Sequence, residues 1–349
     1  MDEFHRKTHV SYFCYRRGNE WPPKDSQYTP STEGWIKLNK RRFHQMDYVQ
    51  ESSSKRYEAY MQCVYSALIV KNFTEYGWAV TKAPKSIVDK LQKRLHKGVA
   101  DEKVRTESQI DCVETDNRPF FLKDDEMNTE ILNALLPFHE AWSGVELIPN
   151  NAYGLRVYRN ETNLNMHLDK RETHVISSIL HVDHGINDEP WPLVIEDFHG
   201  NTNEVILEPG DMLFYESSKL VHGRPTIMNG EYYSSLFSHY YPKNWAETLE
   251  TIVLDTHYSI GGLDVWREAK EKIEGEDNID ELTFVGLSLK EPNCKDAWCG
   301  LQNSIKWDNI SPNYGEIISG DGIVRKLHNI PLQEFFETES STASTKDEL

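Results

Sequence analysis

The chain has little of several features that would define its class. It has five cysteines in 349 residues and no CxxC pair, so a cysteine-based zinc site or a dithiol redox motif is not expected. No apolar run approaches the roughly 18 residues of a transmembrane helix, so no membrane span is predicted. A glycine-rich phosphate loop and a Gly-x-Ser-x-Gly nucleophile elbow are also absent. These absences exclude several common enzyme classes.

Basic residues are also in short supply. The 38 Lys and Arg stand against 56 Asp and Glu, which gives a formal net charge of -18. This balance argues against binding to nucleic-acid phosphates or to anionic membrane surfaces. Five cysteines cannot all pair within one chain; Cys294 and Cys299 are close enough to close a short loop in an oxidising compartment, and reduced thiols are the alternative.

Two histidines and one carboxylate are the strongest positive feature. In His167-Leu168-Asp169 the outer two residues are i and i+2, so on a β-strand both side chains point to the same side. His222 follows much later, as a third ligand from a different strand would. Two His and one carboxylate hold Fe(II) on one face and leave other positions open. The pattern predicts a metal centre; buried histidines satisfied by hydrogen bonds are the alternative.

The rest of the chain predicts a mostly β core with helices before it. Short runs of β-forming residues are separated by turn residues such as Pro209-Gly210 and Asn229-Gly230. The predicted strands are 78–81, 153–158, 164–169, 175–180, 204–208, 211–215, 232–241 and 284–289. The predicted helices are 51–70, a helix capped by Ser86 with Ile87, Leu91 and Leu95 on one face, 130–142 and 263–273.

We therefore predict an α+β protein with a double-stranded β-helix (jelly roll) core, flanking N-terminal helices and a small C-terminal extension. Residues 1–50 are expected to be an irregular lead-in, and 51–245 to hold the helices and the jelly roll. Residues 246–337 are an extension of unassigned role, and 338–349 a flexible tail.

Around these motifs the chain resembles the Fe(II)/2-oxoglutarate-dependent dioxygenases, most closely the prolyl 4-hydroxylase-type catalytic domain. The resemblance covers Asn72 to Pro242, and the segments around His167 and His222 carry it. It implies Fe(II) on His167, Asp169 and His222, with 2-oxoglutarate and O2 as cosubstrates and ascorbate in support. The implied reaction hydroxylates an unactivated C–H bond and releases succinate and CO2. A prolyl residue of a polypeptide is the first substrate to consider, and a small molecule the second.

The resemblance leaves the partner of the 2-oxoglutarate distal carboxylate open. Related enzymes place a Lys or Arg on the last barrel strand, where this chain has Glu231 and Tyr232. A carboxylate in a largely apolar barrel needs a cationic or multiply hydrogen-bonding partner. Arg224 is the preferred candidate because it follows a predicted metal ligand and can bind a carboxylate with two hydrogen bonds. Arg156 is the alternative.

Four further residues are predicted to contact the cosubstrate. Tyr232 and Ser234 share a face of the last strand and carry hydroxyl donors. The resemblance implies that the hydroxyl of Tyr158 faces the cosubstrate. It also implies that a polar residue at the end of the 175–180 strand contacts it, and that residue is His181.

A second motif of the same spacing complicates the metal assignment. His181-Val182-Asp183 is followed directly by His184, and we assign the metal to the first motif instead. Two alternatives remain open. One is an Fe- or Zn-dependent cupin-like enzyme that uses His181 and His184 without 2-oxoglutarate. The other is a non-catalytic jelly-roll binding module with a vestigial triad, which the missing Lys or Arg favours.

The two ends of the sequence bear on location. Lys346-Asp347-Glu348-Leu349 matches an endoplasmic-reticulum retrieval signal that a receptor reads, and the polar tail before it would keep it exposed. The first residues show no apolar signal core. We expect the endoplasmic-reticulum lumen, with the cytoplasm as the alternative. Potential N-glycosylation triplets begin at Asn72, Asn160 and Asn309.

Overall fold

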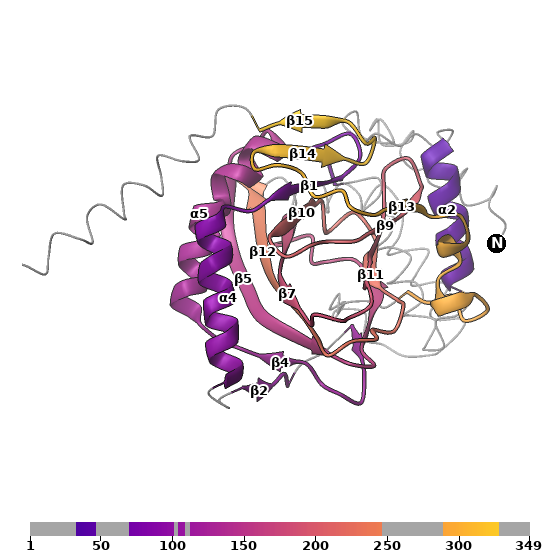
Figure 1. Ribbon diagram of the computed structural model, residues 1–349. Helices are drawn as coiled ribbons and strands as arrows, with labels where there is room; N and C mark the ends of the chain where they lie inside the picture. The colour runs from indigo at the N-terminus through magenta and orange to yellow at the C-terminus, as the bar shows by residue number, and fades with distance from the viewer. Residues whose placement is uncertain (1–32, 47–69, 101–103, 109–111, 246–288, 328–349) are drawn as a thin grey trace, which may run out of the picture.

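Two β-sheets lie face to face and form the core (Figure 1). The computed structural model describes residues 33–46, 70–100, 104–108, 112–245 and 289–327. Within them, the larger sheet has the strand order β15 (Val324–Lys326), β14 (Glu316–Ser319), β1 (Trp78–Lys82), β10 (Asp211–Tyr215), β7 (Ile176–His184), β12 (Tyr232–Pro242), β5 (Leu147–Arg159), β4 (Phe120–Phe121), β2 (Arg105–Thr106). The smaller sheet has the order β13 (Ile305–Trp307), β9 (Thr202–Val205), β8 (Leu193–Glu196), β11 (His222–Arg224), β6 (Asn163–His167), β3 (Val113–Glu114).

The strand pairs are antiparallel except for β13 and β9, which are parallel. Large antiparallel sheets with few helices confirm the predicted jelly roll. Between the sheets, alternate residues of β10 such as Leu213 and Tyr215 pack against Leu193 and Ile195 of β8. Burying each such side chain stabilises the fold by about 1.5–3 kcal/mol, so this layer fixes the distance between the sheets.

Two helices, α4 (Lys85–Ala100) and α5 (Asp125–Ser143), cover the outer face of the larger sheet (Figure 1). The predicted apolar stripe of α4 is buried there against residues such as Phe214 and Leu236. Ser86 is not the cap of α4, because the helix already begins at Lys85. The carbonyl of Pro84 accepts hydrogen bonds from the amides of Ile87 and Val88, so Pro84 holds the position before the first turn.

Strand boundaries follow the sequence where one face is apolar and depart from it at turns. β10 spans the predicted 211–215, whereas β9 ends at Val205 rather than continuing to Glu208. The amide of Glu208 donates to the Asp211 carboxylate at 2.7 Å, which turns the chain before β10 begins. The side chain of Asp211 therefore holds the turn that precedes β10.

One helix lies where an irregular lead-in was expected. α2 (Glu33–Met46) lies against the outer side of the smaller sheet, where Arg41 and Arg42 both bind the buried carboxylate of Glu196. Leu38 of the same helix packs against the hydrophobic core. The predicted helices 51–70 and 263–273 lie outside the described residues, as does most of strand 284–289.

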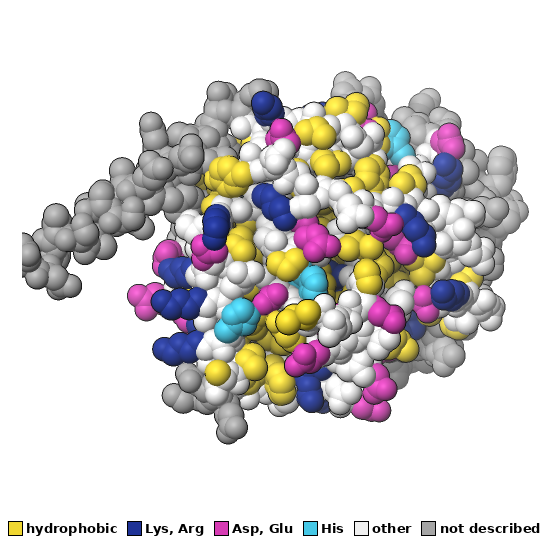
Figure 2. Space-filling model, in the orientation of Figure 1, with side chains coloured by type: hydrophobic (Ala, Val, Ile, Leu, Met, Phe, Trp, Pro, Cys, Tyr) yellow, Lys and Arg dark blue, Asp and Glu magenta, His cyan; other side chains and the backbone are white. Residues whose placement is uncertain are grey.

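The C-terminal extension contributes strands to both sheets. β14 pairs with β1 at one edge of the larger sheet, and β13 pairs with β9 in the smaller one. Among the described helices, none is both long and apolar enough to cross a membrane. On the face shown in Figure 2, basic and acidic side chains alternate and do not gather in a patch of one sign. That face offers no electropositive stripe for a nucleic acid.

Candidate metal centre

His167, Asp169 and His222 converge in the space between the sheets. His167 ends β6, His222 begins β11, and the two residues lie opposite each other in the antiparallel pair. One ligand atom from each of the three side chains lies within 4.8 Å of the others. Nε2 of His167 is 3.7 Å from Asp169 Oδ1, and Nε2 of His222 is 3.9 Å from Asp169 Oδ2. Within the described residues, this is the one group of three or more such side chains whose ligand atoms are close enough to share a metal ion.

Backbone contacts fix both imidazoles in the tautomer that a metal needs. Nδ1 of His167 donates to the carbonyl of Asn165 at 2.7 Å, and Nδ1 of His222 donates to the carbonyl of Leu220 at 2.8 Å. Each Nε2 therefore keeps its lone pair and points toward Asp169. Oδ2 of Asp169 is buried and has no hydrogen-bond partner. A buried carboxylate with one oxygen that lacks a donor, beside two imidazole nitrogens, fits a divalent cation.

The charge states at neutral pH suit the same role. Burial opposes ionisation of Asp169, but the neighbouring imidazoles of His222, His239 and His167 outweigh it and lower its pKa to about 2. Burial lowers the pKa of His222 to about 4, with His167 adding to the effect. The set therefore combines a carboxylate with a neutral imidazole, as Fe(II) or Zn(II) requires.

A chain of polar side chains beside Asp169 was not predicted from the sequence. Nδ1 of His239 lies 4.0 Å from Asp169 Oδ2 and 2.9 Å from the hydroxyl of Ser177. Ser177 lies 2.7 Å from the hydroxyl of Ser217, which donates to the carbonyl of His174. Because Ser217 uses its proton there, Ser177 donates to Ser217 and His239 donates from Nδ1 to Ser177. Burial lowers the pKa of His239 to about 3, so it is neutral.

The second His-x-Asp motif does not form a metal site because a β-bulge divides it. Ser235 of β12 pairs with His181 and Ser234 with Asp183, so Val182 is an extra residue in β7. The bulge turns Asp183 to the outer face, where its carboxylate lies 2.7 Å from Nε2 of His96. His181 stays inside the barrel.

The His181 and His184 alternative is not supported either. Nε2 of His181 lies 2.8 Å from Nδ1 of His184, so the two nitrogens hydrogen-bond each other. Nδ1 of His181 lies 3.1 Å from the carbonyl of Ser234. Burial and the nearby Arg224 hold the pKa of His181 well below its usual value. Both nitrogens of His181 are therefore engaged in hydrogen bonds.

Arg224 lies deep in the barrel, in a group of aromatic side chains. Its guanidinium is 4.4 Å from the ring centre of Tyr233 and 4.7 Å from that of Trp191. Nη2 donates to the Tyr233 hydroxyl at 3.0 Å, and Nη1 donates to the Trp191 carbonyl. The ring of Tyr158 packs edge-on against Trp191. We call Arg224, Tyr233, Trp191 and Tyr158 the arginine pocket.

The charge of Arg224 distinguishes it from Arg156. Within the described part of the chain, no carboxylate lies within 4.0 Å of the Arg224 guanidinium. Arg156 instead binds both oxygens of Glu107, at 2.7 and 2.6 Å, and also donates to the Tyr158 hydroxyl at 3.2 Å. The positive charge of Arg156 is therefore already neutralised, whereas Arg224 is the buried cation that remains available for an acid.

Two of the predicted cosubstrate residues point away from the barrel. Tyr233 faces inward, so its neighbours Tyr232 and Ser234 face the outer side of the sheet. Tyr232 packs in the cluster under the helices, where burial and the nearby Asp183 raise its pKa to about 12. The prediction chose the wrong face of this strand by one residue, and Tyr233 takes the position inside.

The fold and the three convergent side chains define a jelly-roll protein with a candidate metal centre of two histidines and one carboxylate. No family model and no curated protein sequence matches the chain.

Among solved structures, the chain is similar to a Pseudomonas putida prolyl-4-hydroxylase, with 15% identity and a TM-score of 0.38 over 48% of this chain and 94% of that one. A prolyl hydroxylase from Trichoplax adhaerens, solved with a hypoxia inducible factor peptide fragment, has 9% identity and a TM-score of 0.39 over 57% of this chain and 97% of that one. HygX from Streptomyces hygroscopicus, solved with nickel and 2-oxoglutarate, has 11% identity and a TM-score of 0.37 over 49% of this chain and 85% of that one. The similarity concerns fold, and the metal assignment rests on side-chain geometry.

Proposed function

We propose that the chain is an Fe(II)/2-oxoglutarate-dependent oxygenase that hydroxylates an unactivated C–H bond. The observation that carries this proposal is the convergence of His167, Asp169 and His222, with the Nε2 atom of each histidine within 4 Å of one oxygen of the Asp169 carboxylate. The sequence resemblance to the prolyl 4-hydroxylase-type domain supports the choice of iron and 2-oxoglutarate. When bound, Fe(II) would supply the oxidative chemistry that splits 2-oxoglutarate into succinate and CO2.

The residues of the chain hold and orient the reactants. His167 and His222 would bind iron through Nε2, because their Nδ1 protons are already committed to backbone carbonyls. Asp169 is held in turn by its amide, which donates to the carbonyl of Ser217 at 3.0 Å. The side chains of Asp169 and His167 are 16% and 12% exposed while that of His222 is 3% exposed, so His222 is the most deeply buried of the three.

The arginine pocket would receive the distal carboxylate of 2-oxoglutarate. His222 and Arg224 both lie on β11, two residues apart, which corresponds to roughly 7 Å along a strand. A short dicarboxylate can therefore reach from the metal to the guanidinium. The aromatic rings of Tyr233 and Trp191 exclude water around the charge and strengthen the ion pair. Arg224 would thus replace the Lys or Arg that the resemblance places at Glu231 or Tyr232.

A prolyl residue of a secreted polypeptide is the first substrate to test, and a small molecule the second. The KDEL end supports a location in the endoplasmic-reticulum lumen, where a retrieval receptor would read it. The disulfide between Cys294 and Cys299 supports an oxidising compartment. Ascorbate would keep the iron reduced between turnovers.

Succinate formation tests the proposal before any substrate is known. The wild type and Asp169→Ala are compared with 2-oxoglutarate, Fe(II), ascorbate and air, and binding of Fe(II) and 2-oxoglutarate is titrated without oxygen. Turnover or binding that is lost in Asp169→Ala supports the oxygenase. If the wild type neither forms succinate nor binds the two ligands, the oxygenase is rejected in favour of a binding module, which the residues at Glu231 and Tyr232 favour.

A further inference from the structure

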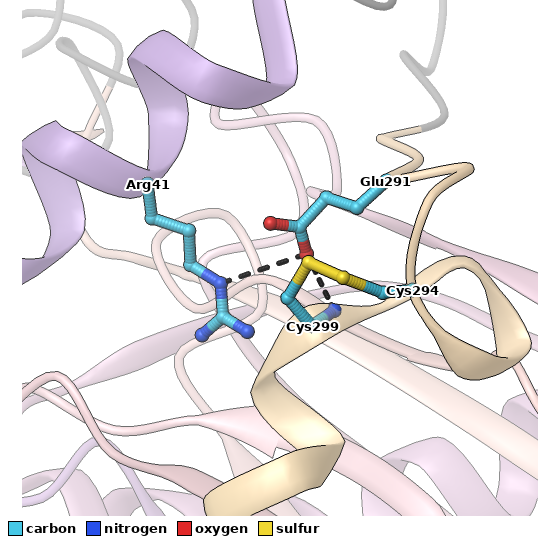
Figure 3. The surroundings of a disulfide bond; sticks show 4 residues. All are labelled: Arg41, Glu291, Cys294 and Cys299. Carbon is cyan, nitrogen blue, oxygen red and sulfur yellow. Dashed lines mark hydrogen bonds and ion pairs between the residues drawn. A yellow bond between two sulfur atoms is a disulfide. The ribbon is translucent and has the colours of Figure 1, made fainter.

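A disulfide closes a short loop on the outer side of the smaller sheet. Cys294 and Cys299 are bonded, and the backbone amide of Cys299 donates to the carboxylate of Glu291 at 2.9 Å (Figure 3). Nε of Arg41, on α2, lies 3.8 Å from the same carboxylate oxygen (Figure 3). The loop is thus closed by its own crosslink, and Glu291 connects it to the helix beside it.

The residues inside the loop have an unusual backbone. Asp296 and Ala297 have φ angles of 52° and 50°, in the left-handed region that few residues other than glycine adopt. Asp and Asn enter this region more readily than Ala. The crosslink on either side of the pair limits the conformations that the loop can reach, and in the structure the Asp296 side chain reaches Thr226 of the barrel.

Asp296 is the first member of a chain of contacts that ends at the arginine pocket. The hydroxyl of Thr226 donates to Oδ2 of Asp296 at 2.9 Å, and the carbonyl of Thr226 accepts from the indole nitrogen of Trp191 at 2.7 Å. The Trp191 carbonyl accepts from Arg224, and the Trp191 ring lies beside the same guanidinium. Trp191 therefore holds Arg224 from two sides and is itself held by Thr226.

We propose that the disulfide-closed loop positions the cosubstrate pocket: Asp296 holds Thr226, Thr226 holds Trp191, and Trp191 holds Arg224 in place for the distal carboxylate. Asp296 and Thr226 are positioning residues, since neither lies in the arginine pocket. The inference rests on the proposed function, because the acid that Arg224 receives is 2-oxoglutarate. It predicts a change in affinity for 2-oxoglutarate that is separate from metal binding and from the chemical step.

Four variants of the full-length chain test the proposal. Thr226→Val removes the hydroxyl with little change in shape, and Asp296→Ala removes the acceptor. Asp296→Asn keeps both an acceptor oxygen and the tolerance for a left-handed backbone, so it is the rescue variant. Lys295→Ala changes an exposed side chain in the same loop and is the control. The KM for 2-oxoglutarate and kcat are measured with Fe(II), and 2-oxoglutarate affinity is titrated without oxygen on Mn(II)-loaded protein.

Thr226→Val and Asp296→Ala are expected to raise the KM and the dissociation constant for 2-oxoglutarate by about 3- to 10-fold, the effect of one lost hydrogen bond. The value of kcat and the affinity for Mn(II) should stay within about 2-fold of wild type, as should all constants of Asp296→Asn and Lys295→Ala. Equal weakening of Mn(II) binding, or no rescue by Asp296→Asn, would overturn the proposal, as would unchanged 2-oxoglutarate constants.

Two further measurements separate this inference from the proposed function. Backbone hydrogen exchange at residues 189–195 should be faster in Thr226→Val than in wild type, whether or not the protein binds 2-oxoglutarate. A wild type that binds no 2-oxoglutarate rejects the proposed function, and unchanged exchange then rejects the positioning chain as well. The double variant Cys294→Ser/Cys299→Ser should raise the 2-oxoglutarate constants in the same range while the protein remains folded by circular dichroism; wild-type constants would show that the crosslink has no part.

Discussion

Two motifs of the same spacing behave differently in the structure. His167-Leu168-Asp169 directs both side chains to one point, 3.7 Å apart. His181-Val182-Asp183 is divided by an extra residue in β7, so that its histidine faces the barrel and its aspartate faces α4. The difference teaches that the i, i+2 spacing is necessary for a shared ligand position but does not secure it, because the strand must also pair without a bulge between the two residues.

The largest expected effect comes from replacing the aspartate of the first motif, with the same replacement in the second motif as its control. Asp169→Asn should abolish turnover and weaken Fe(II) binding by on the order of 100-fold or more, because the carboxylate charge and one ligand oxygen are lost. Asp183→Asn is the matched control: it lies outside the barrel and should leave both quantities unchanged. Metal affinity is measured by anaerobic titration. Equal losses in the two variants would contradict the assignment of the metal to the first motif.

The strand positions show why one motif could be predicted and the other could not be excluded. Strand alternation is a local rule, and it correctly predicted that His167 and Asp169 meet, although β6 ends at His167 and the Ser217 carbonyl holds the amide of Asp169 beyond the strand. A bulge arises from pairing with another strand, here β12, and the local sequence of 181–184 does not encode it. Face assignment failed for the same reason on β12, since a one-residue shift exchanges every side chain between the two faces. Tyr232 and Ser234 were chosen there in place of Tyr233, and His239, on the inner face, was overlooked.

Long-range contacts were also invisible in the sequence. Helix α2 is held by the ion pairs of Arg41 and Arg42 with Glu196, more than 150 residues away, and by the packing of Leu38 on the core. By contrast, β10 was predicted to the residue, because its apolar residues are bounded by the turn at Pro209-Gly210. Elements fixed by local pattern were therefore predictable, whereas those fixed by a distant partner were not.

Arg156 and Arg224 extend the comparison from metal ligands to charged groups and their partners. Arg156 is paired with Glu107, whereas Arg224 is not paired with a carboxylate in the described chain. Arg156→Gln should lower the free energy of unfolding by about 3–5 kcal/mol, because it leaves Glu107 buried without its cation. The double variant Arg156→Gln/Glu107→Gln should recover much of this loss. Urea unfolding measures both, and a single variant as stable as wild type would show that the pair is dispensable.

His139 is a buried histidine that is not a proposed metal ligand, so its effect on stability can be measured without metal. Its ring packs against those of Phe214 and Tyr240, and burial lowers its pKa to about 3. In the unfolded chain it binds a proton near pH 6.5, so the stability from neutral His139 is complete above about pH 6.5 and is lost as the pH falls toward about 3.

His139→Phe should therefore reduce the slope of unfolding free energy against pH, between about pH 4 and 6, by up to about 1.4 kcal/mol per pH unit. The measurement is urea unfolding of metal-free protein at several pH values, so that metal binding does not enter. His139→Gln, which also cannot be protonated in this range, should change the slope equally whatever it does to packing. A slope equal to that of wild type in both variants would show that His139 titrates normally in the fold.

The smallest effect is expected from removing the contact between His96 and Asp183 of the second motif. The His96 side chain is 61% exposed, and its contact with Asp183 competes with water, so the pair is expected to stabilise the fold by less than about 0.5 kcal/mol. His96→Ala should accordingly shift the urea midpoint very little and leave Fe(II) affinity unchanged. The direction of Asp183 is set by the extra residue in β7 and not by the ion pair. If His96→Ala instead altered metal affinity, the ion pair and not the bulge would be what keeps the second motif apart.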